Sequence, residues 1–345
     1  MRNNGNKRNW LMMPAAALLS LGVVLAGCGN NGSNGAASNS TAGSETSGTS
    51  KLHIITSFYP MEEFTSKVAG DLADVEVLIP PGTEPHDWEP TPQDIAKMTE
   101  ANMIVYNGAG MEGWIDQVKD SLGSNGPVLV EASKGVQILE GTEEEDHEHE
   151  GEAGDHSEES ADHSEEGHDH GAFDPHVWLS PKQAQTEVKN IEAALLQLDP
   201  THADQYKQNA DAYIKELTQL DNDYKTGLSS AKRKDFITQH AAFAYMARDY
   251  GLTQVPISGL SPEQEPTAAQ MAKVVDFAKQ HNVKTIFFET LVSPKIAETI
   301  ANEVGAKTAV LNPLEGLTDD QVKAGENYIT VMRENLKGLE QALNE

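Results

Sequence analysis

The chain has 345 residues, a formal net charge of −29 at pH 7, twelve histidines and a single cysteine. An acidic surface repels the phosphates of nucleic acid, so the composition argues against DNA and RNA as partners and favours a cationic ligand. A single cysteine excludes a disulfide within the chain, and the length is enough for two ordinary domains.

Residues 1–27 have the features of a secretory signal peptide: a basic start and an apolar run that is short for a membrane span. The run ends in Leu-Ala-Gly-Cys, with the cysteine at Cys28. This ending resembles the lipobox of bacterial lipoproteins, which implies cleavage before Cys28 and lipidation of its thiol. The alternative is an ordinary signal peptide with a chance cysteine. Residues 28–50 are almost entirely Gly, Ser, Asn, Ala and Thr, which predicts a flexible tether after the lipidated cysteine.

The chain after residue 50 repeats itself at an offset of about 182 residues. LHIITSFYPMEEF (52–64) aligns with KDFITQHAAFAYM (234–246), and ANMIVYNG (101–108) aligns with VKTIFFET (283–290). GPVLVEAS (126–133) aligns in the same way with TAVLNPLE (308–315). A near-constant offset over separate blocks indicates a duplicated unit.

Each unit alternates short β-branched runs with amphipathic stretches, which predicts a parallel sheet with helices on both faces. The expected strands are 52–57, 74–79, 102–106 and 127–131 in the first unit, and 235–239, 253–258, 283–288 and 308–312 in the second. The expected helices include 92–100, 111–122, 267–281 and 293–304.

Residues 182–230 are predicted to form linker helices, which the segment LDPTHAD divides in two. The second helix, from about Thr201 to Tyr224, would be roughly 36 Å long and would span both units as a spine. The predicted fold class is therefore α/β, with two duplicated four-strand parallel-sheet lobes, residues 51–181 and 231–345, joined by this long helix. Two such lobes form a cleft, and ligands of open α/β sheets bind at the carboxyl ends of the strands.

The segment 141–172 is a His/Asp/Glu-rich loop with fourteen acidic residues and no Lys or Arg. It lacks apolar periodicity and is predicted to be disordered without metal. One hypothesis is that it only solubilises the protein. A second is that it gathers zinc weakly near the mouth of the cleft through six histidines, His147, His149, His156, His163, His168 and His170. A third is that zinc occupancy of these histidines reports an excess of zinc.

Three further histidines are candidate metal ligands. His86 lies in the loop after the second strand, His240 follows the first strand of the second lobe, and His176 precedes the linker helices. Glu315, just after the last strand, is the candidate fourth ligand, with Asn312, another carboxylate or water as alternatives. Imidazoles with a carboxylate suit four-coordinate Zn²⁺, whereas Mn²⁺ favours more oxygen ligands. Four protein ligands leave no position for a catalytic water, which favours capture of the metal over catalysis.

Several motifs together resemble the zinc-specific solute-binding lipoproteins of bacterial ABC importers, the ZnuA and AdcA type of the metal-binding cluster A-I family. They are GTEPHDWEPTPQDI, DPHVWLSP, QHAAFAYMARDYGL, GLSPEQEPT and LNPLEGL. The resemblance covers residues 51–345 and implies two α/β lobes joined by a long rigid helix, with one metal in the interlobe cleft.

The same resemblance implies that His86, His176 and His240 are ligands. Manganese-binding relatives have a carboxylate where this chain has His240, so the resemblance favours zinc. Many members have an aspartate in the final loop, where this chain has Asn312. Members also commonly carry a His/Asp/Glu-rich insertion before the second ligand, as this chain does.

These features predict a protein that captures extracytoplasmic Zn²⁺ with high affinity and delivers it to the transmembrane subunit of an ABC-type permease. We expect a monomer that is held on the extracytoplasmic face of the cell membrane by its lipid anchor alone. The alternatives are a manganese-importing homologue and a surface adhesin with a structural metal site. An enzyme is not predicted, because the chain lacks the His-Glu-x-x-His and Gly-x-Ser-x-Gly motifs of metal-dependent and serine hydrolases.

Overall fold

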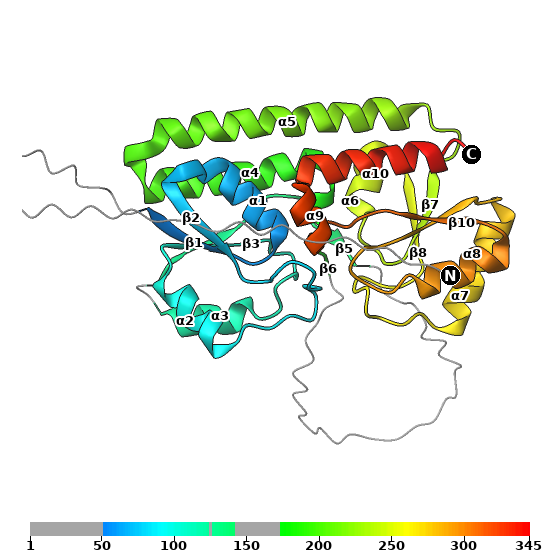
Figure 1. Ribbon diagram of the computed structural model, residues 1–345, viewed down its shortest axis with the longest axis horizontal. Helices are drawn as coiled ribbons and strands as arrows, with labels where there is room; N and C mark the ends of the chain where they lie inside the picture. The colour runs from blue at the N-terminus through cyan, green and yellow to red at the C-terminus, as the bar shows by residue number, and fades with distance from the viewer. Residues whose placement is uncertain (1–50, 124–125, 142–172) are drawn as a thin grey trace, which may run out of the picture. The chain divides into compact units, whose positions relative to one another are not determined.

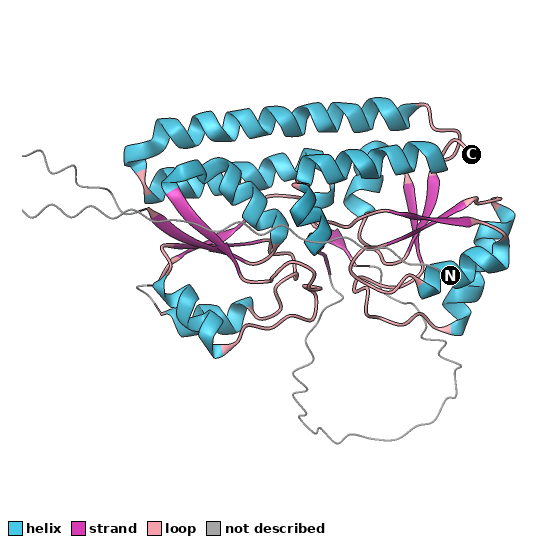
Figure 2. Cartoon of the chain, in the orientation of Figure 1, coloured by secondary structure: helices cyan, strands magenta, loops and turns pink. Residues whose placement is uncertain are grey.

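Two four-stranded parallel sheets organise the part of the chain that the computed structural model describes, residues 51–123, 126–141 and 173–345 (Figures 1 and 2). The first sheet has the order β2-β1-β3-β4 and the second the order β8-β7-β9-β10, so each strand occupies the place of its sequence repeat. The strands of the first sheet are β1 (Leu52–Thr56), β2 (Ala73–Val77), β3 (Met103–Tyr106) and β4 (Val128–Glu131). Those of the second are β7 (Asp235–Thr238), β8 (Thr253–Pro256), β9 (Thr285–Phe288) and β10 (Lys307–Val310).

The predicted α/β fold with two duplicated sheets is thus confirmed, with small differences at the strand ends. β2 and β8 each end two residues before the predicted boundary. Pairing nevertheless continues past both ends, since Ile79 N–H donates to Ser57 O and Ser258 N–H donates to Gln239 O. The backbone pairing therefore reaches the predicted strand ends, although the regular strands β2 and β8 stop two residues earlier.

Helices cover both faces of the sheets. In Figure 1, α1 and α4 lie on one side of the first sheet, and α2 and α3 lie on the other. Helices α2 and α7, which occupy equivalent places in the two lobes, begin alike. Thr91 with Asp94 forms a capping box at the start of α2, and Thr267 with Gln270 forms one at the start of α7. The lobe helices are α1 (Tyr59–Ala69), α2 (Pro92–Glu100), α3 (Ile115–Leu122), α6 (Ala244–Tyr250), α7 (Ala268–Gln280), α8 (Lys295–Val304) and α9 (Asp319–Ala324), with the 3-10 turns η1 (Gly70–Leu72) and η2 (Val177–Leu179).

The spine consists of α4 (Pro181–Leu198) and α5 (Ala203–Ser229), divided at Pro200 by the short turn η3 (Pro200–His202). The 27 residues of α5 extend about 40 Å, because each residue adds about 1.5 Å. The helix packs on α1 of the first lobe and on α6 and α10 of the second. Its contact stripe includes Tyr206, Tyr213, Leu217, Leu220, Tyr224 and Leu228, all buried. No helix among the described residues has the length and apolar character that crossing a bilayer requires.

Two features lie outside the expected elements. A C-terminal helix, α10 (Tyr328–Ala342), packs along α5. A two-stranded antiparallel ribbon of β5 (Leu139–Glu140) and β6 (Phe173–Asp174) joins the residues before and after the segment 142–172. The second strand of the ribbon ends two residues before His176, so the ribbon helps to position this candidate ligand.

Candidate metal site

Four side chains meet between the two lobes: His86, His176, His240 and Glu315, here called the four-residue cluster. His86 lies in the loop between β2 and α2, and His176 lies between β6 and η2. His240 follows β7 and Glu315 follows β10, so each is placed near the carboxyl end of a strand. Sequence positions up to 229 residues apart are thereby brought into one site.

The donor atoms of this cluster are spaced like the corners of a tetrahedron. Glu315 Oε1 lies 3.3 Å from Nε2 of His86, 3.4 Å from Nε2 of His176 and 3.2 Å from Nε2 of His240. His176 Nε2 lies 3.3 Å from the Nε2 atoms of both His86 and His240. Donors placed about 2.0–2.1 Å from a tetrahedral ion are about 3.3 Å apart. The spacing therefore fits a single four-coordinate ion.

The cluster is buried, with one side nearer to solvent. The side chains of His176 and His240 are 0% exposed and that of Glu315 is 1% exposed, whereas that of His86 is 11% exposed. Burial removes competing water and strengthens the attraction between a cation and these donors.

Carboxylates stand behind the two fully buried imidazoles. Asp174 Oδ1 lies 2.8 Å from Nδ1 of His176 and also accepts the backbone N–H of that residue. Glu289 Oε1 lies 2.5 Å from Nδ1 of His240 and accepts its backbone N–H in the same way. A carboxylate at Nδ1 fixes the proton there and turns the lone pair of Nε2 toward the other donors, as in carboxylate–histidine–zinc arrangements.

The loop that carries Glu315 is held by two hydrogen bonds and has one strained residue. Asn312 Oδ1 accepts the backbone N–H of Leu314 at 2.8 Å, so this amide oxygen braces the loop. Trp178 Nε1 donates to Pro313 O at 2.8 Å from the other side of the interface. Leu314 has a φ of 54°, a left-handed conformation that is costly for a non-glycine residue and tends to occur at functional sites.

The carboxylates and imidazoles of the cluster stabilise each other's charged forms. Burial lowers the pKa of His176, but hydrogen bonds to Asp174 and Glu315 outweigh it and leave a net increase. Burial likewise opposes charge on His240, but the carboxylates Glu289 and Glu315 hold its pKa well above the ordinary value. The neighbouring imidazoles keep the pKa of Glu315 well below its ordinary value despite burial. The site is therefore built around a carboxylate that stays ionised.

His86 is held differently from the other two imidazoles. Its backbone N–H donates to both carboxylate oxygens of Glu84, at 3.1 and 3.0 Å. Burial, together with the nearby charge of Glu315, raises the pKa of Glu84 to about 8. Burial lowers the pKa of His86, which favours the neutral imidazole that a metal requires.

A family model described as ZnuA, zinc-uptake complex component A, periplasmic, matches residues 54–342. The chain belongs to this ZnuA family.

Individual ZnuA-type proteins are similar over nearly the whole chain. The high-affinity zinc uptake system protein ZnuA of Bacillus subtilis (strain 168) is 50% identical over 321 residues, which cover 93% of this chain and 94% of that protein. The zinc-binding lipoprotein AdcA of Streptococcus pneumoniae is 46% identical over 297 residues, which cover 86% of this chain. The chain spans only 56% of the length of AdcA.

Solved structures show the same fold. The Zn(II)-bound ZnuA-like domain of Streptococcus pneumoniae AdcA has a TM-score of 0.70 and 43% identity, covering 86% of this chain and 100% of that domain. The laminin binding protein Lmb of Streptococcus agalactiae, described as bifunctional with adhesin and metal transporting activity, has a TM-score of 0.71 and 36% identity. That comparison covers 85% of this chain and 99% of Lmb.

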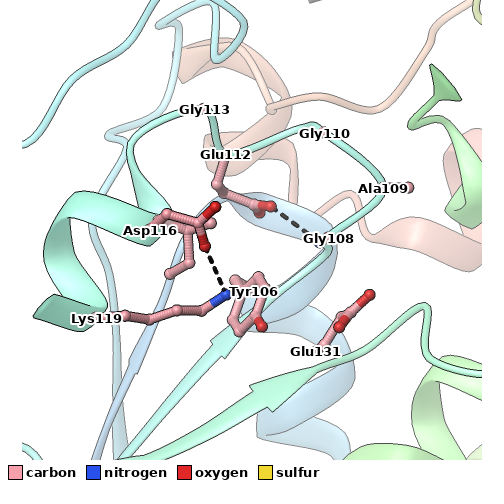
Figure 3. Close-up of a pocket in the computed structure, with 10 residues that line it drawn as sticks. Tyr106, Gly108, Ala109, Gly110, Glu112, Gly113, Asp116, Lys119 and Glu131 are labelled. Atoms are coloured by element: carbon pink, nitrogen blue, oxygen red, sulfur yellow. Dashed lines mark hydrogen bonds and ion pairs between the residues drawn. The ribbon is translucent and has the colours of Figure 1, made fainter. Parts of the chain in front are cut away.

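A separate cavity of about 300 Å³ lies in the first lobe of this ZnuA-family chain (Figure 3). Figure 3 shows Lys119 reaching Asp116, at 3.0 Å, beside Tyr106 and Glu131. None of the four cluster residues lines this cavity. Its lining includes Lys119 and carboxylates but no histidine, which distinguishes it from the imidazole-rich site.

The structure brings together all four residues predicted as metal ligands, whereas the other predicted site residues lie outside the described residues. These are Cys28 and the six histidines His147, His149, His156, His163, His168 and His170. The role of Asp174 behind His176 was not predicted. The sequence signal for it was the carboxylate two residues before the histidine in DPH.

Proposed function

We propose that this protein captures Zn²⁺ outside the cytoplasm and delivers it to an ABC-type permease, with His86, His176, His240 and Glu315 as the metal ligands. The observation that carries the proposal is the near-tetrahedral spacing of three imidazole nitrogens and one carboxylate oxygen, 3.2–3.4 Å apart along five of the six edges. Membership of the ZnuA family and the names of the zinc-binding relatives support it.

The donor set favours zinc over manganese. Zn²⁺ is commonly bound by four nitrogen and oxygen donors in a tetrahedron, whereas Mn²⁺ prefers a larger shell dominated by oxygen. His240 supplies nitrogen at a fully buried position, and its Nδ1 is already engaged by Glu289. Adding two further oxygen ligands would require the surrounding side chains to move.

The closed donor set supports transport of the metal as cargo over turnover of a substrate. A catalytic zinc keeps one position for water or substrate, while four protein donors fill the tetrahedral shell. Delivery then requires that one ligand be withdrawn when the protein meets its permease. His86 is the most exposed of the four and is the natural first ligand to leave.

We also propose how the chain is divided into parts and where the protein is located in the cell. We assign residues 1–27 to a signal peptide, 28–50 to a tether lipidated at Cys28, 51–181 and 231–345 to the two lobes, and 182–230 to the linker helices. The lipid anchor places the protein on the extracytoplasmic face of the cell membrane, where it acts as a monomer with the permease transmembrane subunit as its partner. The lipoprotein name of the relative AdcA supports this location.

The test measures the metal content of the mature protein, wild type and His240→Ala, after dialysis against equal Zn²⁺ and Mn²⁺. We expect one tightly held zinc per wild-type chain and little manganese, and loss of the tight zinc from the variant. Stoichiometric zinc in His240→Ala, or manganese in the wild type at equal free concentrations, would contradict the proposal.

Surface adhesion is a second candidate function, favoured by the structural likeness to Lmb. It is compatible with metal capture, because a lipid-anchored protein is displayed at the surface. Laminin binding by the purified mature protein, measured with and without zinc, tests it separately from transport.

A further inference from the structure

We infer that Tyr245 is a positioning residue that sets His176 of one lobe in register with His240 of the other, an inference that rests on the proposed function. Tyr245 lies on α6, which begins at Ala244, four residues after His240. Its side chain is fully buried, at 0% exposure. It is not a member of the four-residue cluster, so its influence on a bound metal is indirect.

The hydroxyl group of Tyr245 bridges the β5–β6 ribbon. It accepts the backbone N–H of Leu139 at 3.0 Å and donates to the backbone carbonyl of Asp174 at 2.7 Å. Leu139 and Asp174 are directly paired in the ribbon. A phenol from the second lobe thus joins the two strands at this pair.

The ribbon needs this support because it is short. Among the residues that the structure describes, it contains the pairs Leu139 with Asp174 and Glu140 with Phe173, and isolated two-stranded ribbons are at best marginally stable. Arg248, also on α6, donates to Gln137 O at 3.3 Å, and its guanidinium lies 5.2 Å from the centre of the Tyr245 ring. Helix α6 therefore holds the ribbon through Tyr245 and the segment just before β5 through Arg248.

The ribbon in turn controls His176. Asp174 is its last residue, and the Asp174 carboxylate accepts hydrogen bonds from both the backbone N–H and Nδ1 of His176. A hydroxyl group that fixes the backbone of Asp174 thereby fixes the carboxylate that orients this imidazole.

The other end of the connection is the segment from His240 to α6. The carbonyl of His240 accepts hydrogen bonds from Thr238 Oγ1 at 2.8 Å and Gln254 Nε2 at 2.9 Å. Gln254 Oε1 also accepts the backbone N–H of Phe243, directly before the helix, at 3.0 Å. His240 and Tyr245 therefore belong to one firmly held segment. Through Tyr245 this segment sets the 3.3 Å separation between the Nε2 atoms of His240 and His176.

The test compares Tyr245→Phe with Tyr250→Phe in the mature protein. Both variants remove one hydroxyl from a buried tyrosine of the same helix and keep the ring. The Tyr250 hydroxyl bonds Asp221 of α5 at 3.0 Å and has no part in the ribbon, so its loss reports the effect of a missing hydrogen bond on the fold alone. Zinc affinity is measured by chelator competition, and thermal unfolding is measured on the metal-free proteins. The absorption spectrum of bound Co²⁺ reports the geometry of the site.

We expect Tyr245→Phe to weaken zinc binding by about fivefold to tenfold and to change the Co²⁺ ligand-field bands. Tyr250→Phe should lower the unfolding temperature by a similar amount and leave zinc affinity and the Co²⁺ spectrum as in the wild type. The inference fails if Tyr245→Phe binds zinc within twofold of the wild type, or if both variants weaken binding equally. A wild type without a tight zinc site would overturn the proposed function and this inference together.

Discussion

At the residue scale, the site depends on pairs of a carboxylate and an imidazole as much as on the four donors. Asp174 and Glu289 each take two hydrogen bonds from one histidine, one from the ring and one from the backbone. Both carboxylates are nearly fully buried, at 2% and 4% exposure, so their charge acts on the imidazoles with little screening. Each pair also raises the basicity of the Nε2 atom that faces the other members of the cluster.

Neutralising either carboxylate should weaken zinc binding without removing a ligand. We expect Asp174→Asn and Glu289→Gln each to raise the dissociation constant for zinc by about 10-fold to 100-fold, the usual effect of losing such a partner. Chelator competition measures this effect. Asp221→Asn is the control, because Asp221 is similarly buried but bonds Tyr250 and Lys225. Unchanged affinity in both variants would show that the carboxylates do not tune the site.

The sequence singled out the four residues of the cluster but not the contacts that hold them. His86, His176 and His240 stand in distinctive loops, and Glu315 follows the last strand, so strand ends alone bring them together. Asn312 was an alternative to Glu315 in the sequence, and the structure shows its amide oxygen accepting the backbone N–H of Leu314, where φ is positive. That geometry is created by contacts such as Trp178 with Pro313, 135 residues apart, which no local pattern reveals.

At the element scale, helix α4 carries an unusual buried acid. Glu187 is 0% exposed, and neither of its carboxylate oxygens has a hydrogen-bond partner among the described residues. Burial raises its pKa to about 8, and the nearby charge of Glu112 acts in the same direction. The carboxyl group is therefore neutral in the folded protein at neutral pH, although it is ionised in the unfolded chain.

This residue should make stability depend on pH in a defined direction. The folded state holds a proton that the unfolded state releases above about pH 4.5, so the free energy of unfolding falls as the pH rises from there to about 8. Glu187→Gln removes this cost and should stabilise the protein by roughly 2–4 kcal/mol at pH 8, with little gain at pH 4.5.

Denaturant unfolding of metal-free protein between pH 4.5 and pH 8 measures the difference between Glu187→Gln and the wild type. Glu216→Gln, at an exposed position of α5, is the control and should show no such trend. A stabilisation by Glu187→Gln that is the same at every pH would mean that the carboxyl group is not the cause.

The ribbon of β5 and β6 gives the acidic, histidine-rich loop a defined attachment. The ribbon pairs Glu140 with Phe173, which lie on either side of this segment. Deleting residues 143–170 should therefore leave the ribbon and the four-residue cluster in place. We expect the deletion to keep one tight zinc site and to remove only weaker additional binding, because the sequence predicts a disordered segment and ordering such a segment around a metal costs conformational entropy. Isothermal titration with zinc measures both classes, and loss of the tight class would reverse the assignment of the cluster.

The elements of the two lobes were largely predictable because β-branched runs and capping signals repeat along the chain. Thr91 and Thr267 begin matching helices with the same capping box. The ribbon and α10 were not predicted. Two-residue strands carry no periodicity, and α10 acquires its role by packing on α5, about a hundred residues earlier in the chain.

At the scale of the whole molecule, the spine and the interface restrict how the lobes can move. α5 contacts helices of both lobes, and Tyr224 of α5 donates a hydrogen bond to Met332 O of α10 at 2.7 Å. Asp249 of the second lobe accepts hydrogen bonds from Ser180 and Gln183 at the start of α4, both at 2.7 Å. Such ties favour small tilts of the lobes and local movement of the His86 loop over wide hinge opening.

The central claim is that three imidazoles and one carboxylate close around a single Zn²⁺. X-ray absorption at the zinc K-edge, on mature protein loaded with one equivalent of zinc, tests this most directly. The account predicts four nitrogen and oxygen donors at about 2.0–2.1 Å, with the outer-shell scattering of three imidazole rings. A shell of five or six donors, or scattering from fewer than three imidazoles, would contradict it.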